Sequence, residues 1–227
     1  MSADESEARF THLAELLASA VHDLRGQLGI ITLTASCLGR SIEADDLPRQ
    51  KGRILRAAAR MTARVNDLVD AAAIETGQLR VQPAAVEVRP LLEECLEQAR
   101  PAAQSREVAL ELDAPAGARA LCDRARIARV LAALLEHAVR AAPAGSRVTL
   151  GAEPVPEGIR LAVRDQGPGI PPAEQERLFQ RPARGKELGL FVAQGIALAH
   201  GTRVEVVEST PDQGGRLSLC LPLATDR

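Results

Sequence analysis

Two neighbouring side chains near the N-terminus have the chemistry of a nucleophile and its base: the imidazole of His22 and the carboxylate of Asp23. Apolar residues around them recur at heptad spacing, as at Leu17, Leu24 and Ile31, and predict one buried stripe along a long helix. His22 lies off this stripe, on the side expected to face solvent. We interpret His22 as a candidate nucleophile with Asp23 as its base, although a surface histidine considered alone is far more often an ordinary part of a helix surface.

A second set of chemically informative residues lies where a β-like run, 159–163, is followed by Asp165, Gly167 and Gly169. Glycines two apart let a ligand approach the backbone without meeting a Cβ atom. A carboxylate at the end of a strand offers a fixed acceptor to an exocyclic amine such as that of adenine. Another glycine cluster, 185–190, opens a predicted helix whose N-terminal amides suit phosphate oxygens. Each cluster alone is compatible with a simple turn, but together they indicate a nucleotide.

The element that carries His22 is predicted to be a helical hairpin. Its first helix runs from about Glu5 to Ile42 and is followed by a polar turn that Pro48 closes. Its second helix has a regular apolar seam over 54–72 and stops at Gly77. Because each helix has only one apolar stripe, we predict that two copies pair into a dimeric four-helix bundle. Packing of the hairpin on its own C-terminal domain is the alternative.

The rest of the chain is predicted to be an α/β sandwich with helices on one face of a sheet, so that the whole chain is of the α+β class. We place the boundary in the linker 77–83 and predict domains at 1–78 and 79–227. His200, ahead of Gly201, is interpreted as the cap of its helix. The predicted strands are 86–88, 108–112, 147–150, 159–163, 204–207 and 217–221, and the predicted helices are 90–104, 123–141, 172–179 and 188–199.

Composition narrows the classes of function. A formal net charge of -2 and 1% aromatic residues offer no basis for binding nucleic acid. The four cysteines are far apart, which argues against a zinc site or a disulfide framework. We find neither a signal peptide nor an apolar run near the roughly 20 residues of a membrane span. We therefore expect a cytoplasmic protein, without membrane insertion, that receives its signal from a separate sensor protein.

These motifs, taken in order, resemble the catalytic core of bacterial two-component sensor histidine kinases, and the resemblance covers nearly the whole chain. The spacing of the boxes makes the resemblance specific. The matching segments are the phosphoacceptor box Val21–Arg25, the second dimerisation helix from Arg60 to Leu79, the N box Asp123–Arg140, the first glycine box Asp165–Ile170, the F box Arg177–Phe179, the second glycine box Gly185–Leu190 and the closing pattern 192–222.

The resemblance implies a dimerisation and histidine phosphoacceptor domain followed by a Bergerat-type ATP-binding domain, as in gyrase-type and Hsp90-type ATPases. ATP and Mg²⁺ are the implied cofactors, and a response-regulator receiver domain is the implied partner. His22 would attack the γ-phosphate, and an aspartate of the receiver would then take the phosphoryl group. The resemblance assigns catalysis to His22 and Asp23, nucleotide contacts to His137, Arg140, Asp165, Gly167, Gly169, Ile170, Gly185, Gly189 and Leu190, and the metal position to His137.

The sequence departs from the family pattern around the phosphates. His137 stands at the asparagine position that helps hold Mg²⁺, and Ala133 stands at the earlier asparagine position. Imidazole is a poor ligand for Mg²⁺, which prefers oxygen. Arg140 preserves the basic position of the box. Glu187 replaces a glycine in the second glycine box, and only the segment 180–184 separates the F box from that box, so any lid is very short.

Near the phosphoacceptor, Gly26 and Gln27 replace the Thr or Asn and the Pro that are usual there, which argues against phosphatase activity. Three functions follow from the pattern as a whole. The first is a protein-histidine kinase that phosphorylates His22 from ATP. The second is a non-ATP-binding histidine phosphotransfer protein that relays phosphoryl groups between receiver domains. The third is a binding module that regulates a partner kinase.

Overall fold

The computed structural model describes residues 24–35, 47–180 and 188–224. It falls into two compact units. Of the described residues, the first unit holds 24–35, 47–78 and Leu188, and the second holds 79–180 and 189–224. His22 and Asp23 lie outside the described residues.

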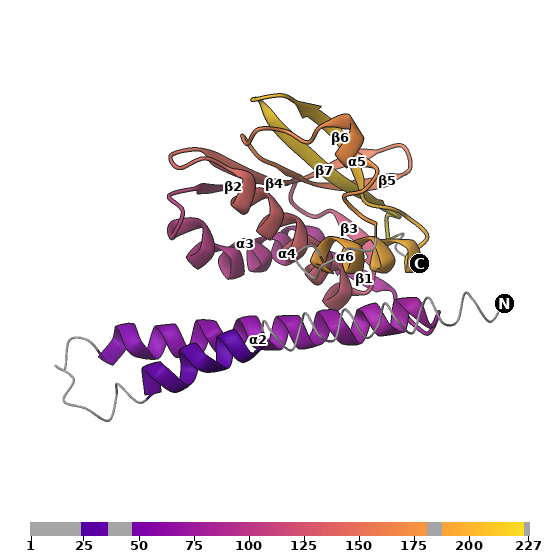
Figure 1. Cartoon of the computed structure of the whole chain (residues 1–227). Coiled ribbons are helices and arrows are strands. Elements are labelled where there is room, and N and C mark those ends of the chain that lie inside the picture. The colour runs from indigo at the N-terminus through magenta and orange to yellow at the C-terminus, as the bar shows by residue number, and fades with distance from the viewer. Residues whose placement is uncertain (1–23, 36–46, 181–187, 225–227) are drawn as a thin grey trace. The chain divides into compact units, whose positions relative to one another are not determined.

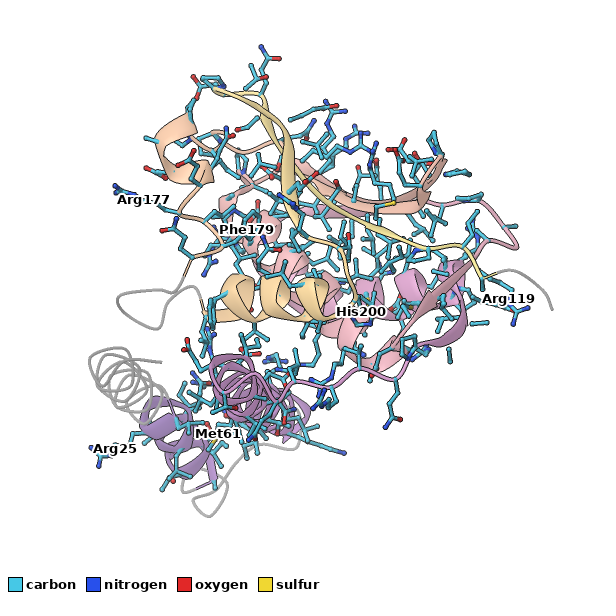
Figure 2. All side chains as sticks on the ribbon, turned by 90° about the vertical axis from the view of Figure 1, so that its right-hand side faces the viewer. Arg25, Met61, Arg119, Arg177, Phe179 and His200 are labelled. Carbon is cyan, nitrogen blue, oxygen red and sulfur yellow. The ribbon has the colours of Figure 1, made fainter. Side chains whose placement is uncertain are left out.

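The first unit is helical. Residues 24–35 form one helical segment, which contains Arg25, and α2 (Leu47–Glu75) forms a second, which contains Met61 (Figure 2). The predicted turn is wrong at its last two residues, because α2 already begins at Leu47 and so includes Pro48. A proline is tolerated there, since the N–H groups of a first turn have no partner within the helix.

The end of α2 confirms the predicted stop at Gly77. Gly77 has a φ of +65°, and its N–H donates to the carbonyl of Ile74 at 3.0 Å. The N–H of Gln78 donates to the carbonyl of Ala73 at 2.8 Å. These two bonds form a Schellman motif, which requires the left-handed conformation that glycine adopts without strain.

The second unit contains two sheets. The smaller one pairs β1 (Ala84–Glu87) with β3 (Arg119–Cys122) in antiparallel fashion. The larger one has the strand order β2-β4-β5-β7-β6, with β2 parallel to β4 and the other pairs antiparallel. The strands of the larger sheet are β2 (Ala109–Asp113), β4 (Arg147–Val155), β5 (Gly158–Arg164), β6 (Glu205–Thr210) and β7 (Gly214–Leu221).

Three helices, α3 (Val88–Gln104), α4 (Arg124–Ala141) and α6 (Leu188–Ala199), lie on one face of the larger sheet (Figure 1). The core between these layers is aliphatic, and its fully buried side chains include Leu131 and Leu135. The helix predicted over 172–179 is shorter in the structure, where α5 (Pro172–Gln175) gives way to turns. The layers are those of the predicted α/β sandwich.

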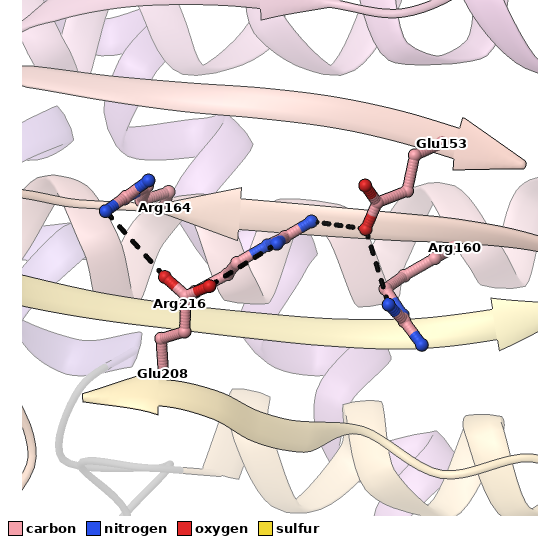
Figure 3. Close-up of polar contacts among 5 residues, drawn as sticks. All are labelled: Glu153, Arg160, Arg164, Glu208 and Arg216. Atoms are coloured by element: carbon pink, nitrogen blue, oxygen red, sulfur yellow. Dashed lines mark hydrogen bonds and ion pairs between the residues drawn. The ribbon is translucent and has the colours of Figure 1, made fainter. Parts of the chain in front are cut away.

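The other face of the larger sheet carries a ladder of alternating charges (Figure 3). Its central residue is Arg216 of β7, whose Nη2 atom lies 2.6 Å from Oε1 of Glu153 and whose Nη1 atom lies 3.7 Å from Oε1 of Glu208. Arg160 and Arg164 of β5 extend the ladder to the same two carboxylates, at 3.4 and 3.7 Å. Cross-strand pairs of opposite charge suit a face exposed to water.

Candidate functional site

The candidate site is organised around Asp165, directly after β5. The residue is buried, with 6% of its surface exposed. Its Oδ1 atom accepts a hydrogen bond from the N–H of Gly167 at 2.7 Å, and its own N–H donates to the carbonyl of Gly215 at 2.9 Å. Among the described residues no group donates to Oδ2, which lies beside Gly215. Asp165 therefore presents one fixed carboxylate oxygen as an acceptor.

The backbone around Asp165 leaves no room for side chains. A Cβ atom on Gly167 would lie 2.8 Å from the carbonyl oxygen of Ala141, and one on Gly214 would lie 1.9 Å from that of Asp165. Gly169 has a φ of +77°, and a Cβ atom there would lie 2.6 Å from a backbone oxygen of β6. The glycines thus let the loop after β5 pack directly against the end of α4 and the β6–β7 hairpin.

The loop after β5 is also held by a side chain that sequence analysis did not assign to the site. The Oγ atom of Ser209 accepts a hydrogen bond from the N–H of Ile170 at 2.6 Å and lies 3.0 Å from the carbonyl oxygen of the same residue. Gln175 donates to that carbonyl as well, at 2.9 Å. Ser209 was recognised only within the closing pattern. Its contact with Ile170 joins segments that are far apart in the sequence.

The site face of α4 is formed by Ala133, His137 and Ala141, which are four residues apart and therefore lie on one side of the helix. A Cβ atom on Gly189 would lie 3.5 Å from Cβ of Ala133, so the start of α6 approaches α4 there. At the other end, the carbonyl of Ala141 meets Gly167. His137, whose Nδ1 atom is buried, therefore lies on α4 between the positions that approach Gly189 and Gly167.

The remaining predicted residues are distributed around this face. Arg140 is exposed in the last turn of α4, where a cation also complements the helix dipole. Gly189 and Leu190 lie in the first turn of α6, and Leu190 is buried. Gly185 lies outside the described residues, as does Glu187. The structure thus brings His137, Asp165, Gly167 and Gly189 around one region of the second unit.

This arrangement fits an adenine nucleotide. The carboxylate of Asp165 is buried and oriented, and the glycines beside it let the loop pack closely with no side chain next to the acceptor. A polar acceptor at the base of such a site can receive an exocyclic amine. The N-terminal turn of α6 lies across the site face of α4, where helix amides and the dipole favour phosphate oxygens.

The same region does not fit Mg²⁺. At the two positions of α4 that would supply amide oxygens, the helix presents the methyl group of Ala133 and the imidazole of His137. Mg²⁺ prefers oxygen ligands in octahedral geometry. The described part of the chain contains no group of three or more His, Cys, Asp or Glu side chains that could hold a metal ion.

Comparisons with known proteins agree with these features. Residues 122–225 match the family described as histidine kinase-, DNA gyrase B-, and HSP90-like ATPase. The sensor-like histidine kinase SenX3 of Mycobacterium tuberculosis is 27% identical over 219 residues, which cover 92% of this chain and 53% of SenX3. The alginate biosynthesis sensor protein KinB of Pseudomonas aeruginosa is 29% identical over 220 residues, covering 92% of this chain and 37% of KinB. The chain thus spans about half or less of the length of these relatives.

Solved structures show the same fold. The histidine kinase AdeS of Acinetobacter baumannii matches with a TM-score of 0.64 and 23% identity, over 90% of this chain and 98% of that one. The mycobacterial sensor histidine kinase MprB matches with a TM-score of 0.54 and 25% identity, over 64% of this chain and 100% of that one.

The comparisons confirm the resemblance to sensor histidine kinases and the Bergerat-type fold of the second unit. None of the described helices is both long enough and apolar enough to span a bilayer.

Proposed function

We propose that this chain is the catalytic core of a protein-histidine kinase, which phosphorylates its own His22 from ATP and passes the phosphoryl group to an aspartate of a response-regulator receiver domain. The observation that carries the proposal is the buried, oriented carboxylate of Asp165 inside a loop built by glycines. The match of residues 122–225 to an ATPase family and the kinase names of the relatives support it.

In the proposed reaction a ring nitrogen of His22 attacks the γ-phosphorus of ATP. The bond from that phosphorus to the bridging oxygen breaks, ADP leaves with the electron pair, and Asp23 accepts or orients the imidazole proton. An aspartate oxygen of the receiver domain then attacks the phosphorus, and His22 is regenerated. Positioning and charge neutralisation supply most of the rate of such transfers.

The residues of the second unit would bind and orient the nucleotide. Asp165 receives the adenine amine, and the loop containing Gly167 and Gly169 lies against the base. The first turn of α6, at Gly189, faces the phosphates with its amides. Arg140 precedes Ala141, the last residue of the site face of α4. Its guanidinium is suited to a phosphate oxygen, because it forms paired charge-assisted hydrogen bonds.

The proposed active form is a homodimer. Several large apolar side chains of the helical unit are exposed in the single chain, which supports pairing with a second copy in a four-helix bundle. They are Leu28 at 52%, Leu33 at 66%, Leu55 at 58%, Val65 at 44% and Val69 at 61% exposure. The cytoplasmic location and the separate sensor protein stay predictions.

A second candidate function is favoured by one specific observation, the donor set of α4. With Ala133 and His137 in place of amides, the site lacks the oxygen ligands that Mg²⁺ would need, while His22 is unaffected. A histidine phosphotransfer protein that exchanges phosphoryl groups between receiver domains would need His22 and no nucleotide. Binding of the intact chain to a partner kinase is the third function.

Incubation with γ-labelled ATP separates these functions. Wild type, His22→Ala and the control His12→Ala would be compared, with Mg²⁺ and with a chelator, and acid-labile label would be counted. Label on wild type and His12→Ala but not on His22→Ala is expected. Absence of label, together with absence of nucleotide binding by calorimetry, would refute the kinase proposal. Transfer of label from a phosphorylated receiver domain to His22 would then support the phosphotransfer function.

A further inference from the structure

His200, the residue after α6, has partners at both ring nitrogens. Its Nδ1 atom lies 2.8 Å from the carbonyl oxygen of Ile196, and its Nε2 atom accepts a hydrogen bond from the backbone N–H of Asp123 at 3.0 Å. Since one nitrogen meets an acceptor and the other meets a donor, the network assigns a neutral ring with its hydrogen on Nδ1. Figure 2 labels His200 at the C-terminal end of α6. The helix cap predicted from the sequence is therefore one of two roles of this side chain, and the bond to Asp123 is the other.

Asp123 forms hydrogen bonds with three segments: the start of α4, the segment 79–83 and His200 after α6. Its Oδ1 atom accepts from the N–H of Arg126 at 3.2 Å and thereby caps the start of α4. Its Oδ2 atom accepts from the N–H of Gln82 at 3.1 Å. Arg126 also donates from Nε to the carbonyl of Arg80 at 3.1 Å. The linker segment 79–83, which leads into β1, is thus fastened to the start of α4 by two hydrogen bonds.

The two ends of α6 therefore meet α4 at different places. The first turn of α6 approaches α4 at Ala133, opposite Gly189, and the last turn is joined to Asp123 through His200. Sliding or rotation of α6 on α4 would break the hydrogen bond between His200 and Asp123 and would change the close approach of Gly189 to Ala133. The end that bears Gly189 is the end proposed to face the phosphates.

We propose that His200 is a positioning residue for the nucleotide site. It fixes α6 on α4, and so aims the first turn of α6 at the phosphates. Through Asp123 it also joins the position of α6 to the linker segment 79–83. The role in aiming α6 at the phosphates rests on the proposed function, because it requires that a nucleotide occupies the site. The link between α6 and the segment 79–83 does not depend on the proposed function.

Two substitutions separate the two hydrogen bonds of the ring. In His200→Gln the side-chain oxygen reaches the place of Nε2 and can still accept from Asp123. In His200→Asn the shorter amide reaches only the place of Nδ1 and can cap Ile196 alone. Both variants remove the imidazole, so a difference between them reports the bond to Asp123 rather than the loss of the ring.

Amide hydrogen exchange without nucleotide is the first readout, on peptides that cover residues 79–83 and 121–126. We expect His200→Asn to exchange about fivefold faster than wild type in both peptides, the factor that loss of one net hydrogen bond gives, and His200→Gln to match wild type. Calorimetric titration with ATP is the second readout. His200→Asn should bind about fivefold more weakly, with His200→Gln within about twofold of wild type. The thermal midpoint of each variant is measured as the control for folding.

The outcomes are distinct. Equal exchange in His200→Asn and wild type would overturn the link to the linker segment 79–83. Equal affinities, or an equal loss in both variants, would overturn the positioning role. If wild type binds no nucleotide, the proposed function fails and the positioning role fails with it, whereas the exchange measurement still decides the link to the linker segment 79–83.

Discussion

The substitution Asp165→Asn should separate nucleotide binding from stability. Asparagine has almost the same shape, and its oxygen can still accept from the N–H of Gly167, the bond that is 2.7 Å long in wild type. Its amide nitrogen, however, would replace the Oδ2 acceptor with a donor. The exocyclic amine of adenine is itself a donor, so the two N–H groups would face one another.

The size of the effect follows from the chemistry of the lost bond. A hydrogen bond to a charged group contributes about 1.5–3 kcal/mol, and an unsatisfied buried donor adds to the loss. We expect ATP affinity to fall by about 3 kcal/mol, which corresponds to roughly a hundredfold in Kd. The free energy of unfolding should stay within about 1 kcal/mol of wild type or rise, because the carboxylate is buried and a neutral amide costs less to desolvate.

Calorimetric titration with ATP and urea denaturation measure the two quantities on the same preparation. Asp113→Asn is the matched control, since Asp113 ends β2 and is exposed. An Asp165→Asn variant that binds ATP within about threefold of wild type would refute the role of Asp165 in adenine recognition. A loss of more than about 2 kcal/mol of stability would show that the carboxylate is structural instead.

Other predictions concern stability and assembly. Gly214→Ala should destabilise the fold by roughly 3 kcal/mol in urea denaturation, because φ is +93° and the new Cβ would lie 1.9 Å from a backbone oxygen; Gly117→Ala, with φ of +77° and open space, should cost about 1 kcal/mol. Burial raises the pKa of the Cys95 and Cys122 thiols to about 11. Both should resist alkylation at pH 8 until the protein unfolds, as followed by mass spectrometry. These folded pKa values exceed the value of 9.0 for a free thiol. Between pH 9 and 11 the thiols therefore ionise more readily in the unfolded chain than in the folded one. The free energy of unfolding should be highest below pH 9 and fall as the pH rises towards 11. Val69→Lys should raise the dimer dissociation constant at least about tenfold in light-scattering measurements, and an unchanged constant would place the interface elsewhere.

The parts of the fold that could be predicted from the sequence depend on local signals. The stop of α2 at Gly77 was predicted because a glycine after an apolar seam marks a helix end. The strand Arg119–Cys122 was missed, because four residues with alternating exposure give little pattern and the strand is defined by its distant partner β1.

The candidate site shows the same division. The loop from Asp165 to Ile170 was predicted because an aspartate and two glycines stand together in the sequence. The contribution of Ser209 was missed, since its contact with Ile170 spans 39 residues. The bond between His200 and Asp123 spans 77 residues, and a histidine before a glycine indicates only a helix cap. Such contacts join residues that are neighbours only in the folded domain.

The pairing of β5 with β7 has a consequence for how this domain can vary. Arg164 faces Arg216 across these neighbouring strands, so the sheet brings together the two ends of residues 165–215, which include α5, α6 and β6. The entropy of closing a loop grows only with the logarithm of its length, and doubling the length costs about 0.6 kcal/mol. The segment 180–184 separates the F box from the second glycine box in the sequence. We therefore expect that doubling the length of this segment would lower the free energy of unfolding by only about 0.6 kcal/mol.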